Sequence, residues 1–174
     1  MNHKDHVDLL RKGVRSPDGV WADLGCGTGA FTLALADLLD ARSVIYAVDT
    51  DRHALSELHR RTQARFPLLD IRPTPADFTQ PLDLPPLDGV VMANSLHFHK
   101  EKEPIVRAVR DLLKPSGCLI LIEYDVDRVN PWVPFPISYA KWRELASRCG
   151  FSSIVKLAAK PSSFLREIYS SLSL

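Results

Sequence analysis

The sequence predicts an α/β fold with a doubly wound, mostly parallel, seven-stranded sheet between two layers of helices. Blocks with the periodicity of strands alternate with blocks that have the periodicity of helices, an order typical of parallel sheets. A glycine-rich turn links the first strand to the helix after it. Only residues 160–163 separate the last two strands. Because a parallel crossover needs about a dozen residues, we expect an antiparallel C-terminal hairpin there.

Seven short apolar runs that end at turn signals are interpreted as the strands. They cover residues 20–24, 43–48, 68–72, 87–93, 118–124, 151–158 and 164–172. The run at 118–124 is interpreted as fully apolar, as expected at the centre of a parallel sheet. The carboxyl ends of the parallel strands should meet at one edge, where such sheets bind ligands. Five loops are therefore expected to face a common crevice: 25–29, 49–51, 77–80, 94–99 and 124–136.

Five segments have apolar residues at helical spacing and are predicted to be helices. They cover residues 4–12, 29–40, 51–64, 102–113 and 139–148. Asp51 is well placed to cap the third helix, and Pro104 suits the first turn of the fourth. Residues 114–117 are predicted to be the turn that ends the fourth helix.

The length of 174 residues predicts a single domain over residues 1–174. Within it, residues 1–18 are expected to be a helical or flexible N-terminal segment. Residues 125–137 contain three prolines and are predicted to form a loop over one side of the crevice.

The charge pattern does not indicate nucleic acid, because the formal net charge is +1 and both signs are interspersed. The sequence contains no run of about 18 apolar residues, so neither a membrane-spanning helix nor a membrane partner is predicted. Cys26, Cys118 and Cys149 lack the spacing of disulfides or metal ligands. They are expected to be free thiols in a reducing cytoplasm, and no metal site is predicted.

The strongest functional signal is the segment 23–29, Asp-Leu-Gly-Cys-Gly-Thr-Gly. Glycines allow a tight turn and a close approach of the backbone to a ligand. The helix that follows offers free N–H groups at its N-terminus. Gly25, Gly27 and Ala30 also match the dinucleotide fingerprint G-x-G-x-x-G/A. The glycines alone therefore leave open a nicotinamide cofactor and another nucleotide-like cofactor.

Asp23 favours the second of these alternatives. A carboxylate so close before the first glycine lies near where a pyrophosphate would bind, and like charges in a partly desolvated cleft repel. The same carboxylate would attract a ligand that carries an ammonium or a sulfonium. The alternative is that Asp23 only caps the glycine turn.

Residues 20–29, Val-Trp-Ala-Asp-Leu-Gly-Cys-Gly-Thr-Gly, closely resemble motif I of the class I S-adenosylmethionine-dependent methyltransferases, which have a Rossmann-like fold. The resemblance continues through residues 45–49, 76–78, 88–97 and 112–122 and covers most of the chain; Ser116 replaces a family glycine. It implies methyl transfer from S-adenosylmethionine by direct in-line displacement to an oxygen, nitrogen or carbon atom. The loop at 94–97 is most similar to the branch that acts on small molecules.

The resemblance also implies which residues bind the cofactor. Asp49 would hold the ribose hydroxyls, Asp77 would accept from the adenine amino group, and Phe78 would flank the adenine ring. The other expected cofactor-binding residues are Asp23, Gly25, Cys26, Gly27, Gly29, Thr50, Asn94 and Ser95.

Structural alternatives stand beside these roles. Asp49 could instead cap the helix that begins near residue 51. Asp77 and Phe78 could belong to an ordinary loop, and Asn94 and Ser95 could only shape theirs.

Candidate catalytic residues follow the fourth and fifth strands, where side chains should point into the crevice. His97 and Tyr124 are the two candidates, with His99 and Asp125 beside them. An imidazole there can take a proton from a nucleophile. Methyl transfer from a sulfonium can also proceed by alignment alone, so His97 is either a base or a loop or capping histidine.

Three classes of function remain open from the sequence. The first is a methyltransferase for a small-molecule acceptor, the second a nicotinamide-dependent oxidoreductase, and the third a non-catalytic S-adenosylmethionine-binding or scaffold protein. Few residues are available to cover the acceptor: either the site is open, or a second subunit of a homo-oligomer completes it, or catalysis is lost. Trp132 and Phe135 either line an apolar acceptor pocket or anchor their loop.

Overall fold

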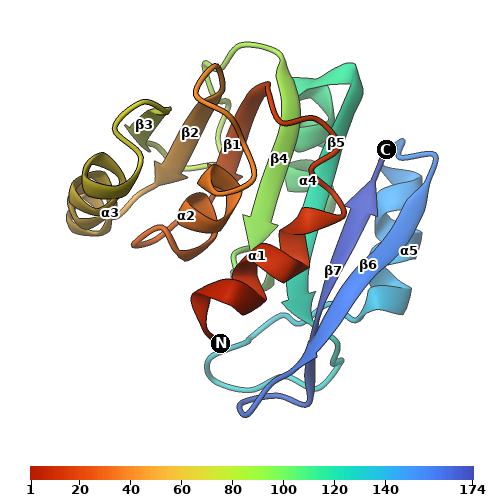
Figure 1. Cartoon of the computed structure of the whole chain (residues 1–174). Coiled ribbons are helices and arrows are strands. Elements are labelled where there is room, and N and C mark those ends of the chain that lie inside the picture. The colour runs from red at the N-terminus through yellow and green to blue at the C-terminus, as the bar shows by residue number, and fades with distance from the viewer.

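A computed structural model describes residues 1–174 as a twisted sheet with helices on both faces (Figure 1). The elements in chain order are α1 (His3–Arg11), β1 (Val20–Leu24), α2 (Ala30–Ala36), β2 (Val44–Asp49), α3 (Arg52–Arg65), β3 (Asp70–Pro75), β4 (Leu87–Ala93), the 3₁₀ turn η1 (Leu96–Phe98), α4 (Glu103–Leu112), β5 (Leu113–Tyr124), α5 (Tyr139–Arg148), β6 (Ile154–Pro161) and β7 (Glu167–Ser173).

The seven strands form one sheet in the order β3-β2-β1-β4-β5-β7-β6. Strands β1 to β5 pair in parallel, whereas β7 is antiparallel to both β5 and β6. This confirms the predicted fold class, including the antiparallel C-terminal hairpin. The chain order reverses between β1 and β4, and the crevice at such a switch point is where doubly wound sheets bind ligands.

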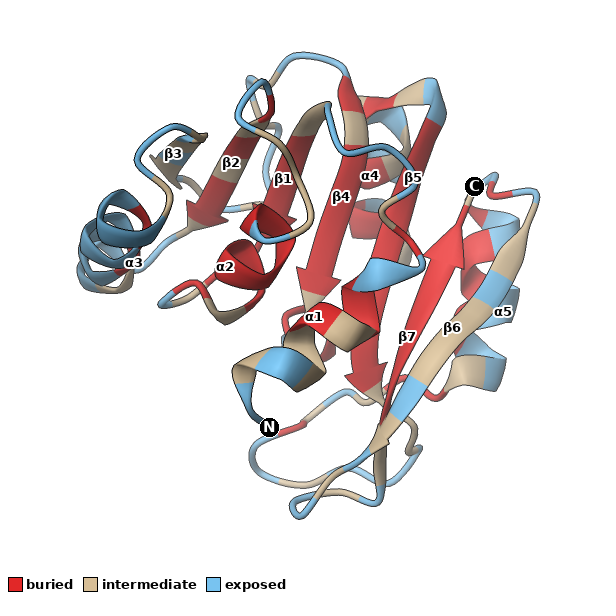
Figure 2. Cartoon of the chain, viewed as in Figure 1, coloured by how far each residue is buried: buried red, intermediate tan, exposed pale blue.

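Two apolar clusters lie on opposite faces of the sheet and account for the three layers. On one face α1 and α2 pack on residues such as Trp21 and Ile120. On the other face α4 and α5 pack on residues such as Val90 and Leu121. Figure 2 shows that β1, β4, β5 and β7 are almost entirely buried between these layers, whereas α3 faces solvent over much of its surface.

The helix starts follow the expected capping chemistry. The Asp51 carboxylate accepts hydrogen bonds from the backbone N–H groups of His53 and Ala54, which confirms Asp51 as the cap of α3. Pro104 lies in the first turn of α4, as predicted. At the N-terminus, Asn2 and Asp5 form a reciprocal capping box that starts α1.

Strand β5 differs from its prediction in two ways. It already begins at Leu113, because Leu113 pairs with Leu87 before a register shift, so the turn predicted at 114–117 is an irregularity within the strand. It is also not fully apolar, because Glu123 lies near its end with only 1% of its surface exposed. A buried carboxylate in a central strand requires a partner, and that partner is part of the site described below.

Several other boundaries are shifted. Strand β3 begins two residues later than predicted because a turn closes at residues 66–69. Helix α2 is shorter than the predicted 29–40 and ends at Ala36. The hairpin turn covers residues 162–166, beyond the predicted 160–163, so β6 ends later and β7 starts later than expected. Strand β6 also begins three residues later than predicted, at Ile154. The 3₁₀ turn η1 was not predicted.

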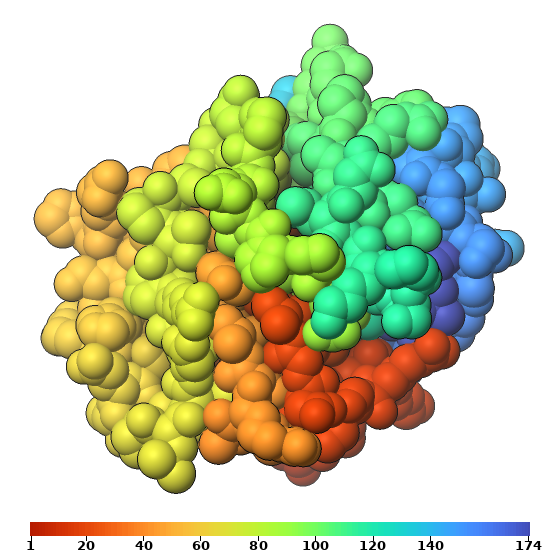
Figure 3. Space-filling model, turned by 90° about the horizontal axis from the view of Figure 1, so that it is seen from above, coloured from red at the N-terminus to blue at the C-terminus, as the bar shows by residue number.

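The parallel strands point their carboxyl ends toward the lower edge of the view in Figure 1, where the 125–137 loop and the tip of the β6–β7 hairpin also lie. Figure 3 shows the opposite edge, at which the segments near residues 40, 85 and 115 lie side by side. None of the helices has the length and the apolar content needed to cross a bilayer.

Candidate functional site

The glycine loop after β1 adopts a backbone that side chains would prevent. Gly25, Gly27 and Gly29 have φ angles of +79°, +52° and +87°, in the left-handed region that favours glycine. A Cβ on Gly25 would lie 2.5 Å from Ser95 Cβ, and one on Gly29 would lie 2.8 Å from the side chain of Leu58. A Cβ on Gly27 would meet nothing within 4 Å. Gly27 therefore faces open space, while the other two glycines permit close packing.

Asp49, at the carboxyl end of β2, holds this loop in place. Its Oδ2 accepts from the Gly27 N–H at 2.8 Å, and its Oδ1 accepts from the Asp51 N–H at 2.9 Å. Since a carboxylate has about four acceptor positions, each oxygen can accept one more bond. The alternative in which Asp49 caps α3 is wrong, because Asp51 does so.

Asp23 lies behind the loop and is only 1% exposed. Its Oδ2 accepts from the Thr32 hydroxyl at 2.6 Å, in the first turn of α2, and not from the glycine turn. Burial raises the pKa of this carboxyl to about 7, although the Thr32 bond lowers it and the Asp49 charge raises it further. Asp23 is therefore shielded behind the loop, and only its charge, not direct contact, is available to act on a ligand in front of the loop.

Asn94 and Ser95 bring the end of β4 against the end of β1. The Ser95 hydroxyl donates to the Leu24 carbonyl at 2.8 Å, so this buried side chain shapes the loop. This contact agrees with the alternative in which Ser95 has a structural role in its loop. Asn94 has a left-handed φ of +53°. Its Oδ1 is buried without a hydrogen-bond partner, which leaves an unused acceptor at the switch point.

Asp77 and Phe78 follow β3 on the other side of the glycine loop. The Asp77 carboxylate accepts from the N–H and the hydroxyl of Thr79, and these bonds lower the pKa of the Asp77 carboxyl. Phe78 lies beside Gly25 and makes an edge contact with the His99 ring at 5.1 Å between centroids. The first residue after β2, Thr50, is exposed.

His97 and Glu123 form a buried pair at the ends of β4 and β5. The His97 Nδ1 lies 2.6 Å from Glu123 Oε2, and the His97 backbone N–H donates to Oε1 at 3.1 Å. Their side chains are 3% and 1% exposed. An ionised carboxylate can only accept, so beside ionised Glu123 the hydrogen is on Nδ1 and the lone pair of a neutral imidazole is on Nε2. The pair has the arrangement of a base and the group that orients it.

Glu123 is the candidate functional residue that the sequence interpretation missed. It follows the apolar run 118–122 directly, and a charged residue within a central strand is rare unless it is paired. That single break in the apolar pattern was the available signal.

Tyr124, the other catalytic candidate, is half-buried and its ring centroid lies 6.2 Å from that of His97. Burial raises the pKa of the Tyr124 phenol, as does the neighbouring Glu123 charge. Asp125 does not serve the crevice: it accepts from the Tyr139 N–H and pairs with Lys156. His99 faces Phe78, and burial lowers the pKa of its imidazole.

The proline-rich loop is tied to the residues around His97. The Phe135 N–H donates to the His97 carbonyl at 3.0 Å, and the Lys102 ammonium lies 5.7 Å from the Phe135 ring centroid. The largest cavity, about 860 Å³, lies between the start of this loop and the tip of the β6–β7 hairpin. Its lining includes Val129 and Arg166 but no residue of the glycine loop, so this cavity is separate from that loop.

Comparison with known proteins identifies the family. The family model described as "Methyltransferase domain" matches residues 22–119, more than half of the chain and including the glycine loop. The chain belongs to this methyltransferase family. It is a class I enzyme of the Rossmann-like type, whose cofactor is S-adenosylmethionine. This excludes the nicotinamide alternative that the glycines alone had left open.

Two solved structures and one curated protein illustrate the similarity of this methyltransferase domain. Magnesium protoporphyrin IX methyltransferase from Synechocystis PCC 6803, solved with bound cofactor, has a TM-score of 0.75 at 19% identity over 98% of this chain and 77% of that chain. The CurJ carbon methyltransferase has a TM-score of 0.73 at 18% identity over 94% and 50%. The highly reducing polyketide synthase aurA of Calcarisporium arbuscula is 28% identical over 80% of this chain. The domain spans only 6% of that synthase's length.

The residues of the crevice fit S-adenosylmethionine. The open space beside Gly27 allows the backbone to approach a ligand, and Asp49 retains an acceptor position on each oxygen. Phe78 offers an aromatic surface beside the glycine loop, and Asn94 Oδ1 is an unused buried acceptor.

Proposed function

We propose that this methyltransferase domain methylates a carbon atom of a small-molecule acceptor that neighbouring carbonyl groups make acidic. The observation that carries the proposal is the buried contact between Glu123 and the Nδ1 of His97 at 2.6 Å. In the proposal this contact engages Nδ1 and leaves Nε2 of His97 to act as the base.

The cofactor-binding roles are part of the proposal. Asp49 binds the ribose hydroxyls with its remaining acceptor positions, and Asp77 accepts from the adenine amino group while Phe78 covers the ring. The N–H groups and open surface of the glycine loop take the amino-acid portion of the cofactor. Asp23 supports a positively charged ligand from behind the loop, because its charge is uncompensated there.

Bound S-adenosylmethionine supplies a methyl group on a sulfonium, which leaves as a neutral thioether when a nucleophile displaces it in line. The residues of the chain prepare that nucleophile. Nε2 of His97 takes the proton from the acidic carbon, and the proton remains on the imidazole as the carbon acquires the methyl group. Glu123 stabilises the resulting imidazolium, and the acceptor is left with one hydrogen replaced by methyl.

A carbon acceptor explains why the fold maintains a buried acid–base pair. Burying two ionisable groups costs several kcal/mol unless their geometry compensates, and alignment alone suffices for a nucleophile that already has a free lone pair. A carbon acid has no such lone pair until a base removes its proton. The similarity to the CurJ carbon methyltransferase, and to polyketide synthases, supports this choice of acceptor.

The test compares His97→Gln and Glu123→Gln with the wild type on a 3-oxoacyl thioester of N-acetylcysteamine. We expect His97→Gln to lower kcat by about 10²- to 10⁴-fold, the range of general base catalysis. Glu123→Gln should lower it less, because Nε2 persists in a poorer orientation. Cofactor affinity, measured by thermal shift, should not change in either variant.

Tyr124→Phe tests the second catalytic candidate separately. It removes only the phenol hydroxyl and keeps the ring, and kcat should stay at the wild-type value because the proposal assigns the proton transfer to His97. An unchanged kcat in the His97→Gln variant would show that His97 is not needed as a base and would overturn the proposal. Loss of cofactor binding in both variants would instead assign the pair a structural role.

The three cysteines are buried and free. This supports the further proposal that the domain works in a reducing compartment such as the cytoplasm.

A further inference from the structure

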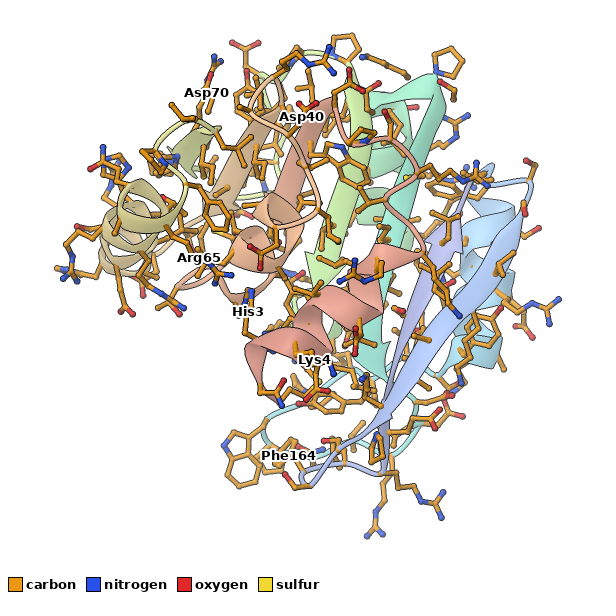
Figure 4. All side chains as sticks on the ribbon, viewed as in Figure 1. His3, Lys4, Asp40, Arg65, Asp70 and Phe164 are labelled. Carbon is orange, nitrogen blue, oxygen red and sulfur yellow. The ribbon has the colours of Figure 1, made fainter.

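Four aromatic rings form a continuous series that starts at the catalytic pair and ends at the surface. The His97 ring lies 6.2 Å from Tyr124, Tyr124 lies 5.8 Å from Phe164, and Phe164 lies 5.8 Å from Trp132, all between ring centroids. The last two contacts are edge-to-face, a geometry that aromatic pairs prefer. We refer to these four residues as the aromatic ladder. Figure 4 shows Phe164 at the tip of the β6–β7 hairpin, beyond the edge of the sheet.

The outer half of the ladder is exposed in a way that a monomeric surface rarely tolerates. Trp132 is 68% exposed and Phe164 is 48% exposed. Val129, Phe135 and Phe98 are also exposed and belong to the loops of the same edge, so five of the eight exposed large hydrophobic residues gather there. A concentrated apolar patch on a soluble domain marks a binding surface.

The loop that carries Trp132 is connected to the site by hydrogen bonds. The Asn130 side-chain oxygen accepts from the backbone N–H groups of Trp132 and Val133, which fixes the turn on which the indole stands. Further along the loop, Phe135 bonds to the carbonyl of His97. The hydrogen bonds therefore hold the outer ring and His97 in one loop structure, and a molecule that lies on the ladder has one end beside the His97 ring.

We propose that the acceptor carries an extended apolar chain, such as an acyl chain, which lies along the ladder with its acidic carbon at His97. The inference rests on the proposed function, since it names the substrate class of the same site. Rings spaced by about 6 Å give one apolar contact for every few methylenes. A chain that continues to Trp132 would cover the exposed faces of both outer rings.

The probe for chain binding is tryptophan fluorescence, because Trp21 and Trp142 are 3% and 0% exposed and only Trp132 faces solvent. Saturated acyl thioesters of N-acetylcysteamine, which lack the second carbonyl, should bind without turnover. We expect a blue shift of the emission and an affinity that rises about two- to fourfold per added methylene, the upper figure corresponding to complete burial. Phe164→Ala, which keeps the Trp132 reporter, should weaken this dependence on chain length. In Trp132→Ala and Trp132→Ala/Phe164→Ala, where affinity is measured by calorimetry because the reporter is absent, the dependence should be abolished.

Val155→Ala is the matched control: this residue is 51% exposed on β6, outside the ladder, and the dependence should persist. With 3-oxoacyl thioesters, the wild-type KM should fall as the acyl chain lengthens, while kcat stays constant. In the double variant, KM should not change with chain length. Methyl transfer by the wild type with a KM that does not depend on chain length would overturn the ladder proposal alone. Chain binding at Trp132 without methyl transfer to any 3-oxoacyl thioester would overturn the proposed function alone.

Two further outcomes would assign the patch to another occupant. A blue shift with phosphatidylcholine vesicles but not with monomeric thioesters would indicate a lipid surface. A blue shift on raising the protein concentration without any ligand, together with dimers in sedimentation, would indicate a second copy of the chain. Either result contradicts the acyl-chain proposal.

Discussion

Replacement of Asp23 by Asn should stabilise the ligand-free domain above neutral pH. The carboxyl is 1% exposed and its only side-chain partner is the Thr32 hydroxyl. Burial raises its pKa from 3.8 to about 7. The folded state therefore binds the proton more tightly than the unfolded state does, and stability is lost as the pH rises from about 4 to about 7. An amide keeps an oxygen for Thr32 and carries no charge to desolvate.

The magnitude follows from the pKa difference of about 3 units, at about 1.4 kcal/mol per unit. Ionised Asp23 costs about 4 kcal/mol of folding free energy at pH 8. Part of that cost is already present at pH 5, where the unfolded carboxyl is ionised and the folded one is not. The stability difference between Asp23→Asn and the wild type should therefore grow by about 2.5 kcal/mol between pH 5 and pH 8. For a chain of this size that is about 5–10 °C in the difference of the two Tm values.

The assay is thermal unfolding of both proteins from pH 5 to pH 8 without ligand. Comparing variants at each pH cancels the other titrating groups, and the exposed Asp83→Asn supplies a control whose Tm difference should stay flat. S-adenosylmethionine at pH 8 should reduce the advantage of the Asp23→Asn variant, because the positive ligand compensates the buried carboxylate. A Tm difference that is constant or shrinks with rising pH would refute the view of Asp23 as a buried, uncompensated charge.

Three further predictions concern the cofactor loop. Asp49→Ala should weaken S-adenosylmethionine binding at least tenfold, or about 1.4 kcal/mol, because it removes the ribose acceptor and the anchor of the Gly27 N–H; unchanged affinity by calorimetry would contradict the assignment. Gly27→Ala should lose binding but remain folded, since its Cβ would point into open space, with only the cost of about 1–2 kcal/mol for a left-handed alanine. Gly150→Ala has the same kind of backbone and the same open surroundings outside the site, so it should show an equal loss of stability with normal binding. In contrast, Gly25→Ala should destabilise the fold itself by forcing its Cβ against Ser95, which a lowered Tm would reveal.

The sequence was sufficient for the fold class and for the cofactor loop, because both depend on local patterns. Alternating periodicities predicted the sheet, and the short link before the last strand predicted the antiparallel hairpin. The glycines at 25, 27 and 29 all have the left-handed φ angles that only glycine adopts readily. Asp51 capped its helix as expected because capping involves residues close in sequence.

Long-range partners were beyond the same reasoning. The Glu123–His97 contact joins residues 26 apart in the chain, and nothing local pairs them. The location of Asp23 behind the loop depends on Thr32 of α2, and the exposed position of Trp132 depends on a turn fixed by Asn130. The hairpin turn was misplaced by a few residues, which hid the contact of Phe164 with both Tyr124 and Trp132. The proposed acceptor chemistry depends on the His97–Glu123 pair and on the Trp132 and Phe164 rings, which is why the sequence left the acceptor open.

The most direct measurement is mass spectrometry of a 3-oxoacyl thioester incubated with the domain and S-adenosylmethionine that carries a trideuterated methyl group. The account predicts that one hydrogen on the carbon between the two carbonyls is replaced by the labelled methyl, and that His97→Gln abolishes this product while still binding the cofactor. Label on an oxygen or nitrogen atom, or an equal rate in His97→Gln, would contradict it.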